Sequence, residues 1–244
     1  MALRVVAIIP ARGGSKGLPR KAIRSLGGKP LIEHTIASSL ASKLIERTIV
    51  STDDDEIASV ARAAGAEVPF MRPAELATDT ASMDLTIDHV LEELASRQGY
   101  IPDAYVILQP TNPFRSSAHI DHAITLMEER HVNSVVSVAE PTEHPAEMVT
   151  FGNGRMTSML GDMDLGAGVQ RQGYPDCYFL TGAIYLTRLS AYRDQSTRFA
   201  VPIAPYVMDP LDGFDIDTPR DLDLAEVIHE YRQRFGNSGW VGEL

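Results

Sequence analysis

Short apolar runs rich in β-branched residues alternate along this chain with segments of helical periodicity, and this alternation limits the folds open to it. The pattern predicts strands near residues 4–10, 47–53, 66–70, 104–110, 134–139, 181–188 and 200–208, and helices near 30–42, 54–64, 83–98, 117–130 and 219–235. Such alternation is typical of βαβ units, which build a mostly parallel sheet with helices on both faces. We therefore expect a doubly wound, Rossmann-like three-layer α/β fold.

One stretch, residues 141–175, breaks this pattern. Helical periodicity fades there, and Gly, Pro, Met and short alternating runs predict a small β arm of the kind that reaches another subunit. We expect residues 1–235 to form a single domain that carries this arm. Residues 236–244 are expected to form a flexible tail.

Composition narrows the class of function. The chain has 244 residues and a net charge of −11, which disfavours general binding to nucleic acid or to an anionic membrane surface. Its single cysteine, Cys177, excludes an intrachain disulfide. Neither a signal-peptide pattern nor an apolar run long enough to cross a bilayer is present in the sequence. We expect a soluble, cytoplasmic protein.

The first predicted strand runs directly into a loop of glycines and cations, residues 11–24. Gly13, Gly14 and Gly17 allow tight turns that present backbone N–H groups, and seven Lys or Arg residues with no acidic residue occupy positions 1–32. A positive island in an acidic protein favours an anionic ligand such as phosphate over an ordinary solvated turn. The spacing matches neither G-x-G-x-x-G nor G-x-x-x-x-G-K-[ST], which excludes a dinucleotide fingerprint and a Walker loop.

A second candidate site lies in the sequence FDIDTPRDL. Asp215 and Asp217 are two residues apart in an extended stretch, so both side chains are expected on one side, where they could hold Mg²⁺. The alternative is a helix start at Thr218 and Pro219, which is equally compatible with the residues alone. Together with the cationic loop, the pair favours metal-assisted phosphoryl or nucleotidyl transfer.

Polar residues that follow predicted strands are further candidates, because ligands of doubly wound sheets bind at the carboxyl ends of the strands. Arg12, Asp53, Arg72 and Gln109 each follow one. Two of them have simpler alternatives. Arg72 could pair with Glu75 on a surface turn, and Gln109 could be a buried amide with all its hydrogen bonds satisfied within the protein.

Seven sequence blocks in a fixed order resemble the cytidylyltransferases that activate sialic acid and related nonulosonic acids as CMP-sugars. The blocks are IPARGGSKGLPRK (9–21), STD (51–53), RPAELATDTAS (72–82), LQPTNPFR (108–115), SVVSV (134–138), GAIYL (182–186) and DIDTPRDL (215–222). The resemblance covers nearly the whole chain. It implies a homodimeric nucleotidyltransferase that transfers CMP from CTP to a keto-sugar acid, with Mg²⁺ as cofactor and pyrophosphate as product.

The resemblance also implies residue roles. Arg12, Lys16 and Lys21 would hold the triphosphate, while Asp215 and Asp217 would bind the metal, with one of them assisting deprotonation of the attacking hydroxyl. Substrate contacts are implied for Ala11, Gly13, Arg72, Ala81, Gln109, Arg171 and Tyr185. Among these, Arg171 would reach the sugar carboxylate from a partner subunit, although a solvated arginine on the arm is also compatible with the sequence.

Four positions depart from the pattern of these enzymes: Ala22, Glu147, Gly168 and Thr181. All four lie at the nucleotide or on the sugar side, so the acceptor is less well defined than the transfer of CMP. One alternative is a synthetase for the eight-carbon acid Kdo, but the tripeptide at residues 15–17 differs from the Ser-Thr-Arg of that group and favours a nine-carbon acid. The other is a nucleotide-binding homologue without turnover, against which Asp215 and Asp217 argue.

Overall fold

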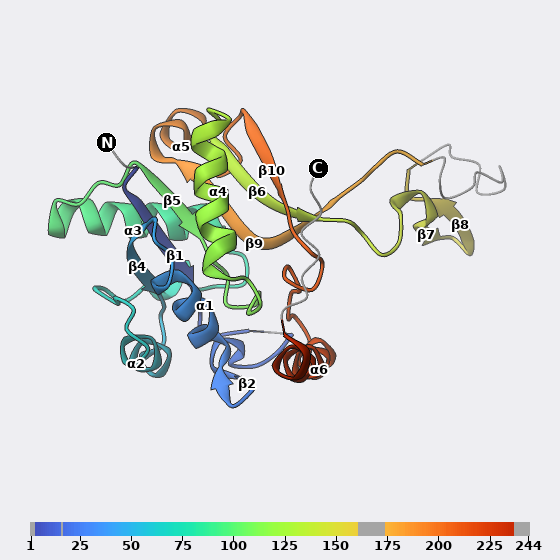
Figure 1. The fold of residues 1–244 in the computed structure, drawn as a ribbon, viewed down its shortest axis with the longest axis horizontal. Coiled ribbons are helices and arrows are strands. Elements are labelled where there is room, and N and C mark those ends of the chain that lie inside the picture. Colours follow the sequence, from blue (N-terminus) through green and yellow to red (C-terminus); the bar gives the residue numbers. More distant parts are fainter. Residues whose placement is uncertain (1–2, 16, 161–173, 237–244) are drawn as a thin grey trace.

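A computed structural model describes residues 3–15, 17–160 and 174–236. In this part of the chain six strands form one sheet in the order β10-β6-β9-β5-β1-β4 (Figure 1). Their bounds are β1 Val5–Pro10, β4 Ile45–Ser51, β5 Ala104–Ile107, β6 Ser134–Ala139, β9 Phe179–Arg188 and β10 Ile203–Val207. β1 pairs in parallel with β4 and β5, and β10 with β6, whereas β9 is antiparallel to both β5 and β6. The predicted mostly parallel α/β sheet is confirmed.

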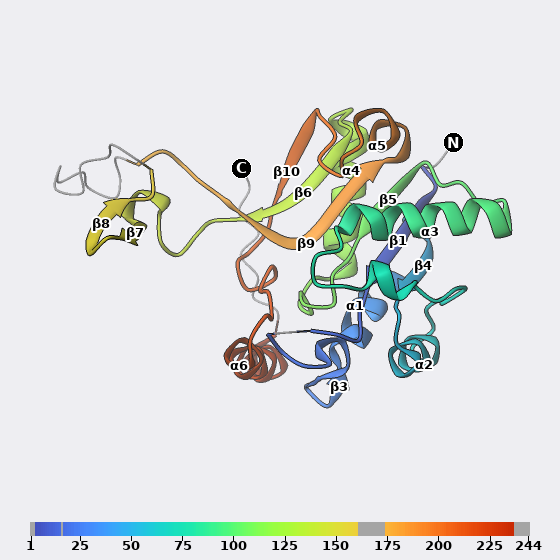
Figure 2. The ribbon, with the colours of Figure 1, turned by 180° about the vertical axis from the view of Figure 1, so that it is seen from behind.

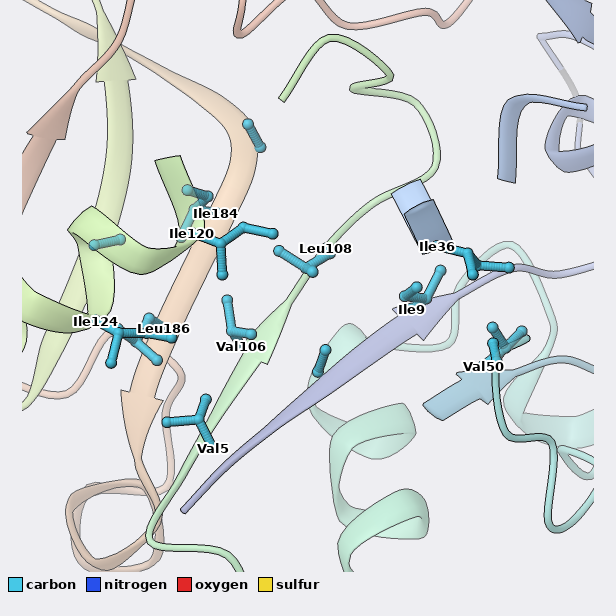
Figure 3. Close-up of a cluster of buried hydrophobic side chains, with 14 of the residues drawn as sticks. Val5, Ile9, Ile36, Val50, Val106, Leu108, Ile120, Ile124, Ile184 and Leu186 are labelled. Atoms are coloured by element: carbon cyan, nitrogen blue, oxygen red, sulfur yellow. The ribbon is translucent and has the colours of Figure 1, made fainter. Parts of the chain in front are cut away.

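Helices cover both faces of this sheet. They are α1 Leu31–Leu40, α2 Asp55–Ala63, α3 Met83–Gln98, α4 Ser117–Glu129 and α5 Leu189–Gln195, whereas α6 Pro219–Phe235 packs apart from the sheet faces, in a smaller cluster described below. Apolar residues of α1, α2 and α4 pack in one buried cluster and those of α3 and α5 in another, on opposite faces (Figures 1 and 2). In β1 the side chains alternate: Val5 and Ile9 belong to the first cluster (Figure 3), and Val6 and Ile8 belong to the second. The continuous apolar run of β1 therefore reflects burial on both sides.

The predicted strand at residues 66–70 is wrong in extent. Only an isolated parallel bridge joins Glu67 to Ile49 of β4. The Glu67 amide donates to the Thr48 carbonyl and its carbonyl accepts from the Val50 amide, at 2.9 and 2.8 Å. Pro69, two residues on, has no N–H with which to continue the ladder. The segment is therefore pinned beside the sheet at one residue and is not a full strand.

The predicted helices at 83–98 and 219–235 match α3 and α6 at both ends, and the other three end within two residues of the prediction. Side-chain caps explain several of these boundaries. The Asp54, Ser82 and Ser116 side chains accept from backbone amides at the starts of α2, α3 and α4, and Thr218 forms a reciprocal capping box with Asp221 in α6. Among the described helices, none has both the length and the apolar character needed to cross a membrane.

The region predicted as an arm contains a two-stranded hairpin that projects from the sheet in both views (Figures 1 and 2). It consists of β7 Val149–Gly152 and β8 Arg155–Ser158, joined by Asn153 and Gly154, both with positive φ. Phe151 is 82% exposed. Residues 161–173 of the predicted arm lie outside the described residues, as do 237–244 of the predicted tail.

A small third apolar cluster joins the two ends of the chain. Leu18, Leu26 and Leu31 pack with Ile216 and Ala225, so α6 docks beside the hairpin of β2 (Ser25–Leu26) and β3 (Lys29–Pro30). Neither this hairpin nor α5 was predicted, because each is too short to show a periodic pattern.

At the hairpin turn, Gly27 has φ +58° and its amide donates to both carboxylate oxygens of Glu226 in α6 at 3.1 Å. We expect Gly27→Ala to destabilise the protein more than Gly28→Ala. Both variants carry the strain of positive φ, about 1–2 kcal/mol. Only at Gly27 would the added Cβ overlap the imidazole of His229, whereas the space beside Gly28 is open. Urea unfolding should show an additional loss of about 1–3 kcal/mol for Gly27→Ala, and equal losses would contradict this packing.

Candidate active site

A pocket of about 290 Å³ lies at the carboxyl ends of β1 and β5. Six residues predicted for the site line it: Ala11, Arg12, Lys21, Arg72, Ala81 and Gln109. Of the predicted residues that the structure also describes, Gly13, Tyr185, Asp215 and Asp217 stand outside this lining. Lys16 and Arg171 lie outside the described residues, so their predicted roles stay predictions. The pocket is where the topology of a doubly wound sheet places a ligand.

Acidic side chains that follow β4 hold the basic loop against the sheet. The Gly13 amide donates to Oδ1 of Asp53 at 3.0 Å, and a Cβ on Gly13 would meet the Asp54 carboxylate at 2.8 Å. Arg20 pairs with Asp54 and with Glu56 at 3.3 and 2.7 Å. These contacts hold Gly13 and Arg20 against the segment that follows β4.

Arg12 spans the pocket from β1 to the segment before α3. Its guanidinium donates to the Thr78 carbonyl at 2.7 Å and pairs with Asp79 at 2.9 Å. Thr78, Asp79, Ser82 and the first residues of α3 also line the pocket. Sequence reasoning named only Ala81 in this wall, because the other residues are unremarkable turn and cap types.

Lys21 links the pocket to the acidic segment near the C-terminus. Its Nζ lies 2.7 Å from Oδ1 of Asp217, and its side chain is only 17% exposed. Gly17 approaches the same segment so closely that a Cβ there would lie 2.5 Å from the Asp217 carbonyl oxygen. The two features that the sequence placed at opposite ends of the chain therefore meet at one site.

The two carboxylates of this segment interact with each other. Asp215 keeps contact with solvent, but the protein around its carboxyl group reduces its hydration and raises its pKa to about 6. A hydrogen bond from Thr111 opposes this rise, whereas the charge of Asp217 and a hydrogen bond with it add to it. Thr218, rather than Asp217, caps α6. The two alternatives for this motif are therefore compatible: Thr218 starts α6, and Asp215 and Asp217 stay exposed to solvent just before it.

The donor set limits which metal could bind here. Among the described residues no cluster of three or more His, Cys, Asp or Glu side chains could hold an ion. Asp215 and Asp217 would supply two hard oxygen ligands, leaving the rest to water and substrate. Mg²⁺ is commonly held in this way, because it retains several waters and prefers phosphate oxygens. The residues present fit such an ion.

Arg72 is buried, with 6% of the residue exposed. Its Nε donates to Ser51 Oγ at 3.0 Å and its Nη2 to the Ser51 carbonyl at 2.5 Å. Burial lowers its pKa to about 10, partly offset by Asp53, so it remains charged at neutral pH. The alternative of a surface pair with Glu75 is wrong, since the side chain turns inward to the end of β4.

Gln109 and Tyr185 lie near each other at the start of the GAIYL block. Gln109 Nε2 donates to the Gly182 carbonyl at 3.2 Å, which fits the interpretation as a satisfied amide, yet the residue also lines the pocket. Burial raises the pKa of Tyr185. A Cβ on Gly182 would lie 3.1 Å from Gln109 Nε2 and 3.9 Å from the Tyr185 hydroxyl. Tyr185 is therefore beside the pocket wall and not in it.

The departures from the resembled pattern have different surroundings. Ala22 is buried and forms part of the pocket wall. Thr181 is buried and bonds through Oγ1 to Ser137 Oγ at 2.7 Å, so its hydroxyl has a partner within the protein. Glu147 is exposed in a short 3₁₀ helix, Pro145–Glu147. Gly168 lies outside the described residues.

Asn112 is a structural residue of the site that the sequence did not single out. It is fully buried, and its Nδ2 donates to the carbonyls of Thr181, Gly213 and Phe214 at 3.0–3.3 Å. These bonds tie β9 to the loop segment that carries Asp215. The only sequence signal was its position inside the LQPTNPFR block.

We expect Arg72→Leu to destabilise the protein by about 2–4 kcal/mol, because it removes charged hydrogen bonds and leaves buried groups of Ser51 without their donor. Arg12→Leu, in the same pocket, breaks a partly exposed ion pair and should cost less than about 1 kcal/mol. Urea unfolding at pH 7 measures both. Similar losses for the two variants would show that Arg72 is not a buried part of the wall.

Comparison with known proteins shows which family the chain belongs to. A family model described as cytidylyltransferase matches residues 6–158. CMP-N,N'-diacetyllegionaminic acid synthase from Legionella pneumophila is 35% identical over 95% of this chain and 98% of its own length. N-acylneuraminate cytidylyltransferase from Escherichia coli is 32% identical over 96% of this chain, which spans only 54% of that protein. Pseudaminic acid cytidylyltransferase from Campylobacter jejuni is 29% identical over 93% and 97%.

Solved structures support the fold. CMP:2-keto-3-deoxy-manno-octonic acid synthetase complexed with CTP superposes with a TM-score of 0.68 at 18% identity, covering 94% of this chain and 99% of that one. A 4-diphosphocytidyl-2C-methyl-D-erythritol synthase from Anaerococcus prevotii gives 0.63 at 13% identity over 94% and 97%. The family model and the sequence relatives identify this chain as a member of the cytidylyltransferase family, a nucleotidyltransferase enzyme.

Proposed function

We propose that the protein transfers CMP from CTP to the hydroxyl of a nonulosonic acid and releases pyrophosphate. The observation that carries this proposal is the ion pair between Lys21 and Asp217 beside the pocket, which unites the cationic loop with the acidic pair. Relatives named for legionaminic, neuraminic and pseudaminic acids support the substrate class. The structural likeness to a Kdo-type synthetase concerns the fold, so that acceptor stays a minor alternative.

Each part of the site has a role in this reaction. Arg12 and Lys21 line the pocket as cations and would offset negative charge that develops on the pyrophosphate leaving group. Lys16 is proposed to act with them. Mg²⁺, held by Asp215 and Asp217, would supply charge neutralisation and polarisation of the phosphate. One of these two carboxylates, directly or through water on the metal, would also accept the proton of the attacking hydroxyl.

The nucleotide and the acceptor are assigned to different walls. Arg72, Ala81 and the start of α3 would surround the cytidine, with Ala11 and Gly13 against the phosphates. Gln109 and Tyr185, next to Gly182, would face the acceptor. Buried Ala22 makes part of the nucleotide wall apolar, so this chain would bind the nucleotide with fewer polar contacts there.

We also propose a homodimer formed through the arm. Phe151, Met156, Met159 and Leu160 are each more than half exposed, which is unusual for large apolar side chains on one small hairpin and its flank. Contact between two copies would bury these residues. Arg171 is proposed to act across that contact on the acceptor carboxylate. A cytoplasmic location is proposed from the sequence and from the CTP-dependent reaction.

The reaction is tested by incubating the purified protein with CTP and Mg²⁺ and each of neuraminic, legionaminic, pseudaminic and Kdo-type acids. We expect pyrophosphate and a CMP-sugar with at least one nine-carbon acid and little with the Kdo type. Product with the Kdo type alone would select the alternative acceptor. CTP binding without pyrophosphate from any acid would instead indicate a nucleotide-binding homologue without turnover.

Asp217→Asn should lower turnover about a hundredfold or more, because it removes a metal ligand and the partner of Lys21. Asp223→Asn is a matched control: Asp223 is an exposed residue in α6, and its loss should leave turnover within about twofold of the native rate. Initial rates across a Mg²⁺ titration give both values. A near-native rate for Asp217→Asn would restrict the motif to its structural role at the start of α6.

A further inference from the structure

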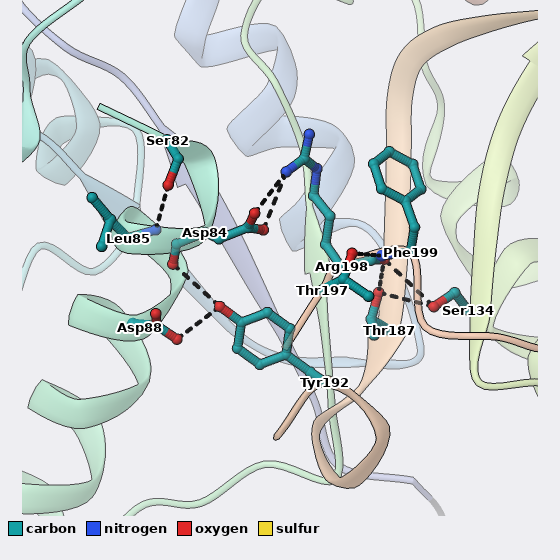
Figure 4. A network of polar contacts seen from close by, with 10 residues as sticks. All are labelled: Ser82, Asp84, Leu85, Asp88, Ser134, Thr187, Tyr192, Thr197, Arg198 and Phe199. Carbon is teal, nitrogen blue, oxygen red and sulfur yellow. Dashed lines mark hydrogen bonds and ion pairs between the residues drawn. The ribbon is translucent and has the colours of Figure 1, made fainter. Parts of the chain in front are cut away.

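Outside the lining of the pocket, Arg198 connects the two sides of the site. It lies between α5 and β10, and its Nη1 donates to both carboxylate oxygens of Asp84 at 3.1 Å (Figure 4). Asp84 is in the first turn of α3, between Met83 and Thr86, which line the pocket. Arg198 therefore holds the turn of α3 that forms the nucleotide wall.

The same guanidinium also lies over two aromatic rings, those of Phe199 and Tyr185. Its Cζ is 4.8 Å from the centre of the Phe199 ring and 5.8 Å from that of Tyr185. Tyr185 and Phe199 meet edge to face with centroids 5.7 Å apart. A cation over two rings that already contact each other restricts the tilt of both. The Tyr185 ring is therefore packed between Phe199 and Arg198.

The backbone of Arg198 is anchored to the central sheet. Its carbonyl accepts from Thr187 Oγ1 in β9 at 2.7 Å and from Ser134 Oγ in β6 at 3.4 Å (Figure 4). The two hydroxyls also bond to each other at 3.3 Å. Because the backbone of Arg198 is fixed to the sheet, its side chain can fix the position of Asp84, and with it the start of α3, relative to the sheet.

We propose that Arg198 is a positioning residue, which sets the relative placement of the nucleotide wall at α3 and the acceptor-side ring of Tyr185. This inference rests on the proposed function, because it assigns Tyr185 to the acceptor. Arg198 touches neither substrate in the proposal. It acts on the acceptor through Tyr185 and on the nucleotide through Asp84.

Tyr192 provides a matched control for this role. Its hydroxyl donates to Asp88 Oδ1 at 2.7 Å and lies 3.3 Å from the Asp84 carbonyl, so it anchors the same end of α3 without lying over Tyr185 (Figure 4). Tyr192→Phe removes that anchor and keeps the ring. A purely structural role for Arg198 would make Arg198→Gln and Tyr192→Phe behave alike.

We expect Arg198→Gln to lower kcat/KM for the acceptor roughly ten- to a hundredfold, because small displacements of reacting groups have effects of this size. Asp84→Asn should lower it several-fold, and Tyr192→Phe should leave it within about twofold, although all three reduce the melting temperature. Arg198→Lys, which keeps the charge and loses the fork, should fall between native and Arg198→Gln. The double variant Asp84→Asn/Arg198→Gln should be no worse than Arg198→Gln alone.

Two outcomes would overturn the proposal. One is an acceptor kcat/KM that falls equally in Arg198→Gln and Tyr192→Phe, and the other is full additivity in the double variant. Calorimetric titration with CTP alone separates this test from the test of the proposed function. If the native protein binds CTP but transfers CMP to no acid, the proposed function is wrong. CTP affinity of the Asp84→Asn, Arg198→Gln and double variants can still be compared in that case. Non-additive losses of affinity would show that Arg198 and Asp84 act together, and additive losses would reject the positioning role of Arg198.

Discussion

The site depends on the docking of the C-terminal helix against the N-terminal loop. Leu18, Leu26 and Leu31 pack with Ile216 and Ala225 in a cluster separate from the two that cover the sheet. Burial of these apolar side chains is the driving force, and it fixes the start of α6 beside the loop. Lys21 and Asp217 then meet although 196 residues separate them. Without this contact the sheet could form, but Lys21 would lose its acidic partner Asp217.

A second constraint is electrostatic. The protein is strongly acidic, yet the pocket is bordered by cations, and the described cations Arg12, Arg20 and Lys21 each pair with a carboxylate. These partners come from the loop after β4, the segment before α3 and the start of α6. Because such pairs are partly exposed, each contributes little to stability, but together they hold long side chains near the pocket. The acidic residues thus organise a basic site.

Sequence reasoning succeeded where the signal was local. Caps and periodicity give helix ends, so α3 and α6 were predicted at both boundaries. It failed where a segment is short or held by one contact, as for α5 and the bridge at Glu67. It could not choose between the two environments of Arg72, because burial against Ser51 depends on how the chain returns to the end of β4. Nor did it single out Asn112, whose three carbonyl partners come from distant segments.

The sequence by itself determined the α/β class, most helices, the glycine- and cation-rich loop after the first strand and the spacing of Asp215 and Asp217. These features are local, since they follow from periodicity, backbone preference and charge within a few residues. Only the tertiary structure decided that β9 runs antiparallel between β5 and β6, that Arg12 crosses to Asp79 and that Arg198 lies between α3 and Tyr185. Those contacts depend on which apolar faces are buried against each other, and this packing involves segments that are far apart in the sequence.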